Sequence, residues 1–339
     1  MKKLINQKNF LRINAITLGS VLVLILVGSI VRVMGAGMGC PDWPKCFGAY
    51  VPPNSSEALP ENYQEVYKEQ RIAKNERLSN VLNSLGYEKL SEKITNDPAV
   101  QVEHEFDVTK AWVEYVNRLV GVLIGFLVIL NMIFSFSYRQ KSVWIPTMGI
   151  LIFLLTVFQG WIGSLVVSTN LLHGFITFHM LLALLMVAML IWMNVRIREL
   201  GIYRHKWLFI IGIATTILFI PQIILGTEVR GVIDDLLVST VSRGEWADFL
   251  STSFFVHRSY SWLILIGAVM LFYFARKTNE PWLINTSMRL VILVFAAMVA
   301  GIIMVKGGFP VWLQPLHLIL AVGIFSLLFY LTLRLRLEK

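Results

Sequence analysis

Eight long runs of apolar residues dominate the sequence, separated by short polar stretches and by one long polar segment. A helix of about 20 such residues, rising about 1.5 Å per residue, spans the roughly 30 Å hydrocarbon core of a bilayer. It also satisfies its own backbone hydrogen bonds, which a bilayer core requires. The pattern predicts eight membrane-spanning helices, at 13–34, 113–135, 143–167, 172–195, 206–226, 254–275, 284–304 and 311–333.

Composition agrees with this class, since 56% of the 339 residues are hydrophobic and only 15% are charged. The charged residues gather between the apolar runs, as in membrane proteins rather than soluble ones. The first apolar run follows a basic amino terminus, as a signal peptide would. Its length and its lack of a small-residue cleavage pattern favour a retained helix. We therefore expect an all-α integral membrane protein.

Lysine and arginine predict the orientation, because short loops rich in these residues stay in the cytoplasm. The short loops on one side hold only Arg230, Arg243 and Lys306. The other side, which includes both termini, holds Lys2, Lys3, Lys8, Arg12, Arg139, Lys141, Arg196, Arg198, Arg204, Lys206, Arg276, Lys277, Arg289, Arg334, Arg336 and Lys339. We expect both termini in the cytoplasm and the long segment 35–111 outside a bacterial cytoplasmic or mitochondrial inner membrane. The net charge of +9 thus reflects topology and indicates no nucleic-acid partner.

The long segment 35–111 has two parts. Its first part is rich in Gly and Pro and holds the only two cysteines, Cys40 and Cys46, which we expect to form a disulfide. That disulfide is either a loop staple or, since exposed short-loop disulfides are labile, a redox-active pair. Zinc is not expected, because two thiolates lack the further ligands of a structural site. The charged part, roughly 56–97, predicts a solvated helical hairpin.

The chain also contains an internal repeat, which divides it into halves 1–200 and 201–339. The matching segments are 28–32 with 226–230, 114–125 with 255–267, and 177–184 with 315–322. Each half has an even number of spans, so the halves share one orientation. We expect two pseudo-symmetric four-helix bundles related by an axis along the membrane normal.

Four polar positions are matched by the repeat, near the outer ends of alternate spans. Asn117 aligns with His257, and His179 aligns with His317. Histidine in a membrane helix is costly unless it finds a partner, so these positions suggest function. Two facing imidazoles in a bundle suit a haem iron, and His257 with His317 form a complete pair. The alternative is that each histidine only bonds a neighbouring helix.

An arginine follows the first matched position in each half, Arg118 in one and Arg258 in the other. A guanidinium there suits a haem propionate, although an arginine at a helix end also reaches the interface without a ligand. Glu114 lies one turn before Asn117 on the same helix face and has no acidic counterpart in the second half. We expect Glu114 to be catalytic, the alternative being an ion pair with Arg118. His173 is interpreted as a loop residue and a weak ligand candidate.

At these residues the chain resembles the haem A synthase family, membrane enzymes that convert haem O into haem A for cytochrome oxidases. The resemblance spans all eight predicted helices and lies in 28–46, with its Cys-Pro-Asp-Trp-Pro-Lys-Cys loop, and in 114–119, 222–230, 257–258 and 316–318. It implies that His257 and His317 are iron ligands of a resident haem b. It also implies that substrate haem binds the amino-terminal half near His179, Asn117 and Arg118, with Glu114 taking part in oxidation of a methyl group to a formyl group.

The chain departs from the family at Asn117, where the family usually has a histidine. An amide is a poor iron ligand, so His179 would hold substrate haem alone or with an unexpected partner such as His104. The segment 50–111 also exceeds what the resemblance explains. Expected partners are haem O, membrane lipid, a haem O synthase and an electron donor. Two other functions stay open, a non-enzymatic dihaem cytochrome and a haem transporter or chaperone; the oligomeric state is not predicted.

Overall fold

The structure, a computed structural model, describes residues 6–97, 100, 105–237 and 239–337. His104, one of the ligand candidates, lies outside them. Within this part of the chain, eight helices are long and apolar enough to cross a membrane, which confirms the predicted class. They are α1 (Gln7–Val33), α5 (Val108–Ser135), α6 (Trp144–Ser168), α7 (His173–Ile197), α8 (Lys206–Leu237), α9 (Thr252–Arg276), α10 (Pro281–Lys306) and α11 (Leu313–Arg334).

The ends of several of these helices have identifiable causes. The side chain of Asn6 accepts a hydrogen bond from the Asn9 backbone N–H at 2.8 Å, and Asp107 does the same for Lys110 at 2.9 Å. Such caps satisfy backbone donors that have no partner inside the helix. Pro281 occupies the first turn of α10, where its missing N–H costs nothing.

Helix α8 is eleven residues longer than the sequence predicted, ending at Leu237 rather than at 226. The apolar run stops at 226 because charged residues follow it. One of them is Arg230, which was predicted to lie in a loop. That placement was wrong. Arg230 forms an i,i+4 ion pair with Asp234, and Asp234 also binds Arg32 of α1. The paired charges let the helix continue beyond the apolar run.

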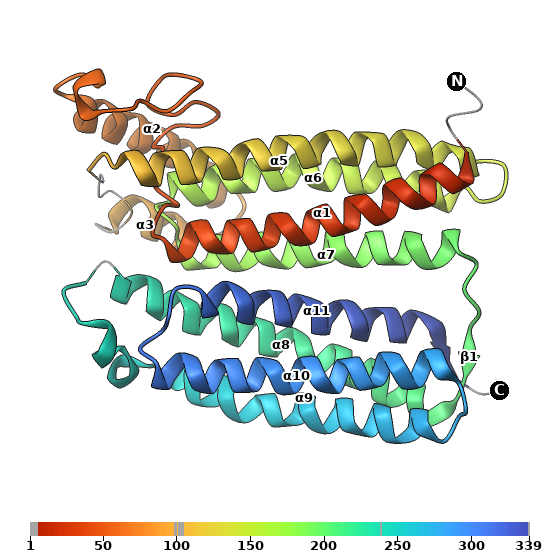
Figure 1. The fold of residues 1–339 in the computed structure, drawn as a ribbon. Coiled ribbons are helices and arrows are strands. Elements are labelled where there is room, and N and C mark those ends of the chain that lie inside the picture. Colours follow the sequence, from red (N-terminus) through yellow and green to blue (C-terminus); the bar gives the residue numbers. More distant parts are fainter. Residues whose placement is uncertain (1–5, 98–99, 101–104, 238, 338–339) are drawn as a thin grey trace.

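The long helices lie side by side in two groups (Figure 1). In the first group α1 packs against α5 and α7, and α6 packs against both α5 and α7. In the second group α8 packs against α9 and α11, and α10 packs against both α9 and α11. The groups meet where α11 packs against α1 and α7, and where α7 meets α8. Two apolar clusters form the core, one around Phe10, Ile152 and Leu190, the other around Leu271, Leu290 and Leu328.

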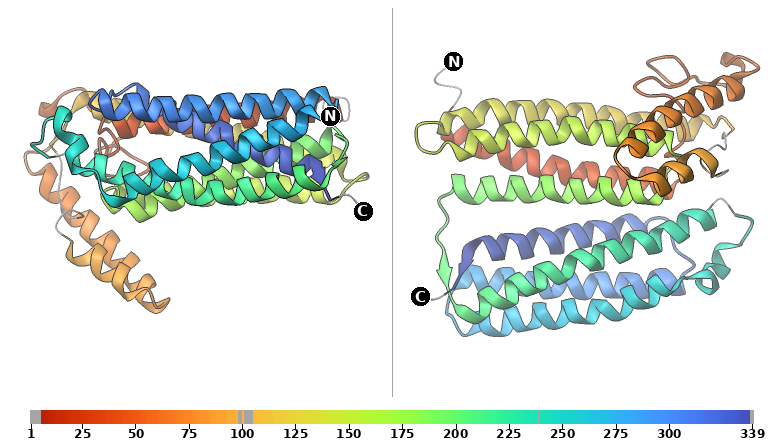
Figure 2. Two further views of the ribbon diagram at one scale, coloured as in Figure 1. Left: turned by 90° about the horizontal axis from the view of Figure 1, so that it is seen from below. Right: turned by 180° about the vertical axis from the view of Figure 1, so that it is seen from behind.

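The segment between α1 and α5 lies at one end of the helices, which we call the loop end (Figure 2). It contains η1 (Ser56–Ala58) and a helical hairpin of α2 (Tyr63–Ser84) and α3 (Glu88–Asn96), which confirms the predicted hairpin. The hairpin packs against α6 through α2. The short helix η3 (Arg243–Phe249) lies at the same end, between α8 and α9.

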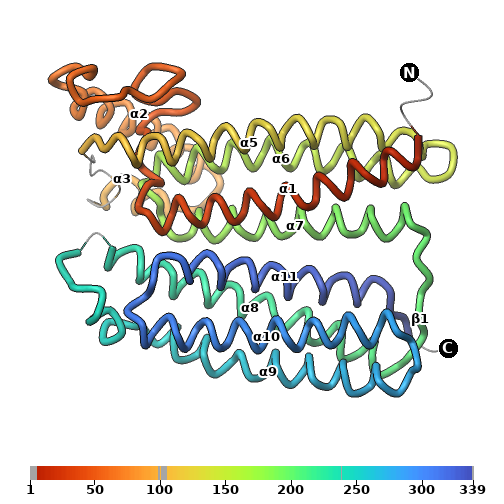
Figure 3. Tube along the Cα trace, viewed as in Figure 1, coloured from red at the N-terminus to blue at the C-terminus, as the bar shows by residue number. Residues whose placement is uncertain are grey.

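The opposite end, which we call the linker end, holds the connection from α7 to α8 (Figure 3). There β1 (Tyr203–Arg204) pairs in parallel with β2 (Leu335–Arg336), directly after α11. The short helix η2 (Phe136–Tyr138) follows α5 at this end. The chain segment joining the two groups of helices is therefore tied to the segment that follows the last helix.

Candidate functional site

His257 on α9 and His317 on α11 lie together, with ring centroids 6.4 Å apart and planes inclined at 68°. His257 Nδ1 is 3.2 Å from the Gln222 carbonyl oxygen of α8. A carbonyl only accepts hydrogen bonds, so this contact requires the proton on Nδ1 and leaves the Nε2 lone pair free. Ligating histidines are oriented by this kind of second hydrogen bond. In return, Gln222 Nε2 donates to the His257 carbonyl at 3.1 Å.

The separation of the two rings fits a metal held between them. A metal–imidazole bond of about 2 Å on each side, with roughly 1 Å from nitrogen to ring centroid, puts opposed imidazoles about 6 Å apart. No group of three or more His, Cys, Asp or Glu side chains in the described part of the chain could hold a bare ion. The residues present therefore suit an iron whose remaining ligands come from a porphyrin.

A glycine on a neighbouring helix faces each of the four matched positions. A Cβ added to the glycine would approach the facing side chain to between 3.2 and 4.0 Å. The pairs are Gly28 with Asn117, Gly163 with His179, Gly226 with His257, and Gly301 with His317. The repeat aligns Gly28 with Gly226 but does not by itself show that these glycines face the matched side chains. The glycines leave room beside the ligand positions, and the tightest approach, 3.2 Å, is at Gly226.

The amino-terminal half brings Asn117 on α5 and His179 on α7 to equivalent places. The Asn117 side-chain oxygen and His179 Nδ1 are buried and have no hydrogen-bond partner among the described residues. Such groups cost free energy unless something binds them, so they mark a place for a ligand. Gln159 of α6 donates to the His179 carbonyl at 3.1 Å, as Gln222 does to His257.

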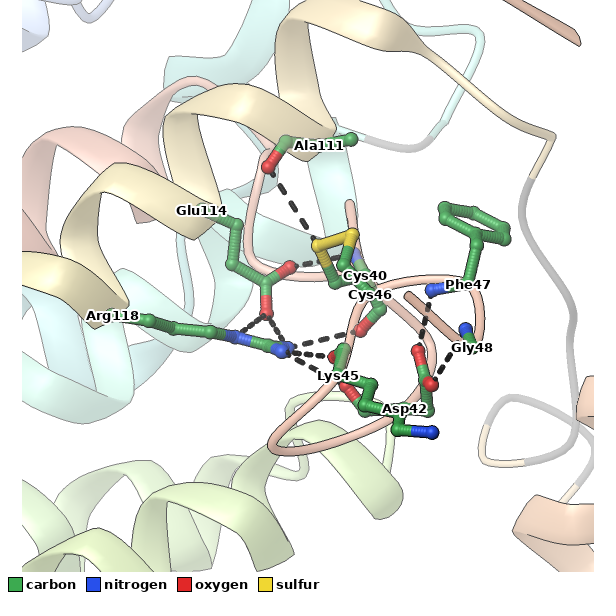
Figure 4. The surroundings of a disulfide bond; sticks show 9 residues. All are labelled: Cys40, Asp42, Lys45, Cys46, Phe47, Gly48, Ala111, Glu114 and Arg118. Atoms are coloured by element: carbon green, nitrogen blue, oxygen red, sulfur yellow. Dashed lines mark hydrogen bonds and ion pairs between the residues drawn. A yellow bond between two sulfur atoms is a disulfide. The ribbon is translucent and has the colours of Figure 1, made fainter. Parts of the chain in front are cut away.

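Glu114, three residues before Asn117 on α5, is 4% exposed and joins α5 to the cysteine loop (Figure 4). One carboxylate oxygen accepts a hydrogen bond from the Cys40 backbone N–H at 2.9 Å. The other carboxylate oxygen forms an ion pair with Arg118. This ion pair is the alternative to a catalytic role that was considered from the sequence. The pair also fixes the carboxylate in position, and the catalytic role of Glu114 stays a prediction.

All five N–H groups of the Arg118 guanidinium are engaged. Nε and one Nη2 hydrogen bind Glu114. The rest reach three loop carbonyls, of Asp42 at 2.9 Å, Lys45 at 2.7 Å and Cys40 at 3.2 Å. A guanidinium has five such donors and no more. Arg118 therefore holds the loop onto α5, and its contact with a propionate stays a prediction.

Cys40 and Cys46 form a disulfide, with an S–S distance of 2.00 Å. Both are buried, at 0% and 1% exposure, so the premise that this disulfide is exposed was wrong. The loop lies directly on α5, and a Cβ at Gly39 would lie 2.4 Å from the Lys110 carbonyl oxygen. Asp42 closes the loop by accepting the backbone N–H groups of the two residues after Cys46.

Two other candidates lie away from these groups. His173 is the first residue of α7 rather than a loop residue, so that interpretation was wrong. Its Nε2 is 3.4 Å from a carboxylate oxygen of Asp235, and it points away from His179 toward Gly231 of α8. Arg258 is exposed and makes no side-chain hydrogen bond or ion pair to any described residue. Its contact with a propionate also stays a prediction.

Eight apolar helices long enough to cross a membrane, with two histidine rings close together inside one group of helices, define a polytopic helical membrane protein. The chain belongs to the family of cytochrome oxidase assembly proteins, whose model matches residues 12–80 and 83–329. Its relatives include the heme A synthase of Pelagibacter ubique, 23% identical over 92% of each chain, and that of Ehrlichia canis, 25% identical over 92% of this chain and 88% of the relative. The heme A synthase of Shewanella oneidensis is 23% identical over 70% of this chain and 62% of its own. The resemblance noted in the sequence is confirmed at the level of the family.

Proposed function

We propose that this chain is a haem A synthase, which oxidises one methyl group of haem O to a formyl group for cytochrome oxidase. One observation carries the proposal. A complete histidine pair in one half is matched in the other by Asn117 and His179, with the buried carboxylate of Glu114 one helical turn away. A simple electron carrier gives no reason for this asymmetry, whereas a chemical reaction on a bound haem does.

In the carboxyl-terminal half, His257 and His317 would hold haem b through Nε2, with the Gln222 carbonyl fixing the tautomer of His257. When bound there, haem b supplies one-electron redox chemistry. Gly226 and Gly301 leave space beside the two rings. Arg258, exposed on α9, is free to meet a propionate at the edge of this site.

In the amino-terminal half, His179 would be the iron ligand for substrate haem, and Asn117 would face it from α5. Glu114 would take up a proton during the reaction or stabilise positive charge that develops on the carbon of the methyl group. Arg118 and the Cys40 N–H hold the carboxylate at a fixed position for this work. A site with one strong ligand suits a haem that must be released after reaction.

The same proposal extends to the whole molecule. The halves 1–200 and 201–339 would be pseudo-symmetric four-helix bundles, supported by the equivalent helix contacts and the repeated glycine–ligand pairs. The distribution of lysine and arginine supports an orientation with both termini in the cytoplasm and the loop end outside. The proposed partners are haem O, membrane lipid, a haem O synthase and an electron donor.

Glu114→Ala tests the proposal in an oxidase-assembling host that lacks its own haem A synthase. Extracted haems from cells with the wild-type chain should contain haem A, and cells without it should accumulate haem O. The variant should keep its haem b and lower haem A by about a hundredfold or more, since a positioned acid or base contributes that much.

Glu76→Ala, on the exposed face of α2, is the matched control. Normal haem A from the Glu114 variant would overturn the catalytic role, and unchanged haems in all cells would favour a cytochrome or transporter.

A further inference from the structure

Lys74 of α2 lies over the loop end of the amino-terminal site. Its Nζ donates a hydrogen bond to the Ser164 carbonyl of α6 at 3.3 Å. Ser164 directly follows Gly163, the glycine against which the His179 ring packs. The neighbouring Asn75 donates to the Ser168 carbonyl at 2.9 Å and holds α2 on the end of α6. The helical hairpin thus brings an ammonium group to the part of α6 that lies beside His179.

The charge of Lys74 is not balanced by an acid. The residues one turn away on its own helix are Gln70, Arg71, Arg77 and Leu78. Across the part of the chain that the structure describes, no carboxylate lies within ion-pairing distance of its Nζ. Burial lowers the pKa of Lys74, and the positive charge of Arg118 lowers it further. Lys74 is thus a half-buried cation without an acidic partner among the described residues.

The Lys74 ammonium also has donors to spare. An ammonium has three N–H groups, and the Ser164 carbonyl accepts one of them. Arg118, the only other cation shown to act on Lys74, has all five of its donors bound to Glu114 and the cysteine loop. An anion reaching this point would therefore find open donors on Lys74 rather than on Arg118.

We propose that Lys74 binds a propionate carboxylate of the substrate haem in the amino-terminal site. The inference rests on the proposed function. A carboxylate would supply the missing counter-charge and accept the open N–H groups, and charge-assisted hydrogen bonds of this kind are strong. Propionates bound to Lys74 would point to the loop end, with the ring below them beside His179. The hairpin of α2 and α3 thereby contributes a residue to the site.

Another role for Lys74 must be separated from this one. A lysine near a helix carboxyl end stabilises the last carbonyls and the helix dipole, and Ser164 lies in the last turns of α6. That role affects stability alone, whereas the proposed role affects the affinity for a carboxylate-bearing haem. Replacing the carboxylates on the ligand distinguishes the two without altering the protein.

The test is a spectroscopic titration of haem O into the purified full-length chain in detergent, using the wild type, Lys74→Met, Lys74→Arg and Lys68→Met. Lys68 is exposed on the same helix and serves as the matched control. We expect Lys74→Met to weaken haem O binding about tenfold to a hundredfold. Lys74→Arg should keep most of the affinity, and Lys68→Met should change nothing. With the dimethyl ester of haem O, the wild type and Lys74→Met should bind equally.

Two results would overturn the inference. One is haem O affinity in Lys74→Met equal to that of the wild type, and the other is the same loss of affinity for the ester as for the free acid. Thermal unfolding of each variant shows whether the fold survives. Haem A formation by the wild type is measured separately. A wild type that binds haem O through Lys74 but forms no haem A would reject the proposed function and leave this inference standing. An active wild type whose binding ignores Lys74 would reject this inference alone.

Discussion

The side-chain oxygen of Asn117 lies on α5 toward Gly28 of α1, at the place where His257 lies toward Gly226 in the other half. The two side chains have similar surroundings and different chemistry, because an imidazole nitrogen binds iron well and an amide oxygen does not. Under the proposed function, the difference at this one residue would separate a haem held permanently from a haem that can leave.

Asn117→His should convert the amino-terminal site into a tight haem site. The new imidazole would face His179 as His257 faces His317, so purified protein should carry more haem per chain. Haem A formation should fall, because product release would slow. Haem extraction and absorption spectra of the purified variant measure both effects. Combining the change with His179→Ala should remove the gain, and unchanged haem content in the single variant would contradict the argument.

The sequence was sufficient to single out the histidines as candidate ligands, but it did not predict which residues pack around them. The repeat places His257 and His317 at equal depth, and two histidines in apolar helices stand out by their cost. Nothing in the spacing shows that the donors of Arg118 are all used by the cysteine loop, because those acceptors are backbone carbonyls. Lys74 lies in a segment without a repeat partner, and only the packing of α2 on α6 brings it to the site.

At the scale of elements, the cysteine loop depends on a close backbone contact with α5. A Cβ at Gly39 would lie 2.4 Å from the Lys110 carbonyl oxygen, which no side-chain movement relieves. At Gly37 of the same loop, a Cβ would meet only the Leu171 side chain, at 3.2 Å, and that side chain can shift.

Gly39→Ala should therefore lift the loop and withdraw the Cys40 N–H from Glu114. We expect a loss of about 1–3 kcal/mol of stability, typical of overpacking, together with a marked loss of haem A formation. Gly37→Ala should have a smaller effect on both. Thermal unfolding in detergent and haem extraction from cells measure the two quantities, and equal behaviour of the two variants would count against the close contact.

The helices themselves were predicted well, since their apolar runs are long and their ends carry charge. Helix α8 is the exception, because the charged residues after 226 predict a loop where the helix in fact continues. Arg230 and Asp234 belong to a helix because they pair with each other and with Arg32, which is nearly two hundred residues away in the sequence. A local pattern contains no information about a partner at that distance.

At the scale of the whole molecule, Asp234 joins the two groups of helices at the loop end. It lies between Arg32 of α1 and Arg230 of α8, with a side chain only 15% exposed. Arg230 also donates to Gln314 of α11 and to the Arg32 carbonyl. One carboxylate thus offsets two arginines at the contact between the groups.

Asp234→Asn should destabilise the protein by on the order of 3 kcal/mol, because it leaves two nearly buried guanidinium groups without a counter-charge. The neighbouring Asp235 is 72% exposed and pairs only with His173, so Asp235→Asn should change stability little. Thermal unfolding of both variants in the same detergent gives the comparison. Equal midpoints would show that the network at Asp234 does not hold the groups together.

The short ladder between β1 and β2 changes how a large substrate can move through this molecule. It ties the α7–α8 connection to the end of α11, with a further hydrogen bond from the His205 N–H to the Arg336 carbonyl at 3.1 Å. The Arg32–Asp234 pair fastens the same two groups of helices at the opposite end. Groups joined at both ends do not swing apart as hinged domains do. A flat, lipid-soluble molecule would therefore enter between neighbouring helices from within the bilayer rather than through a hinged opening between the groups.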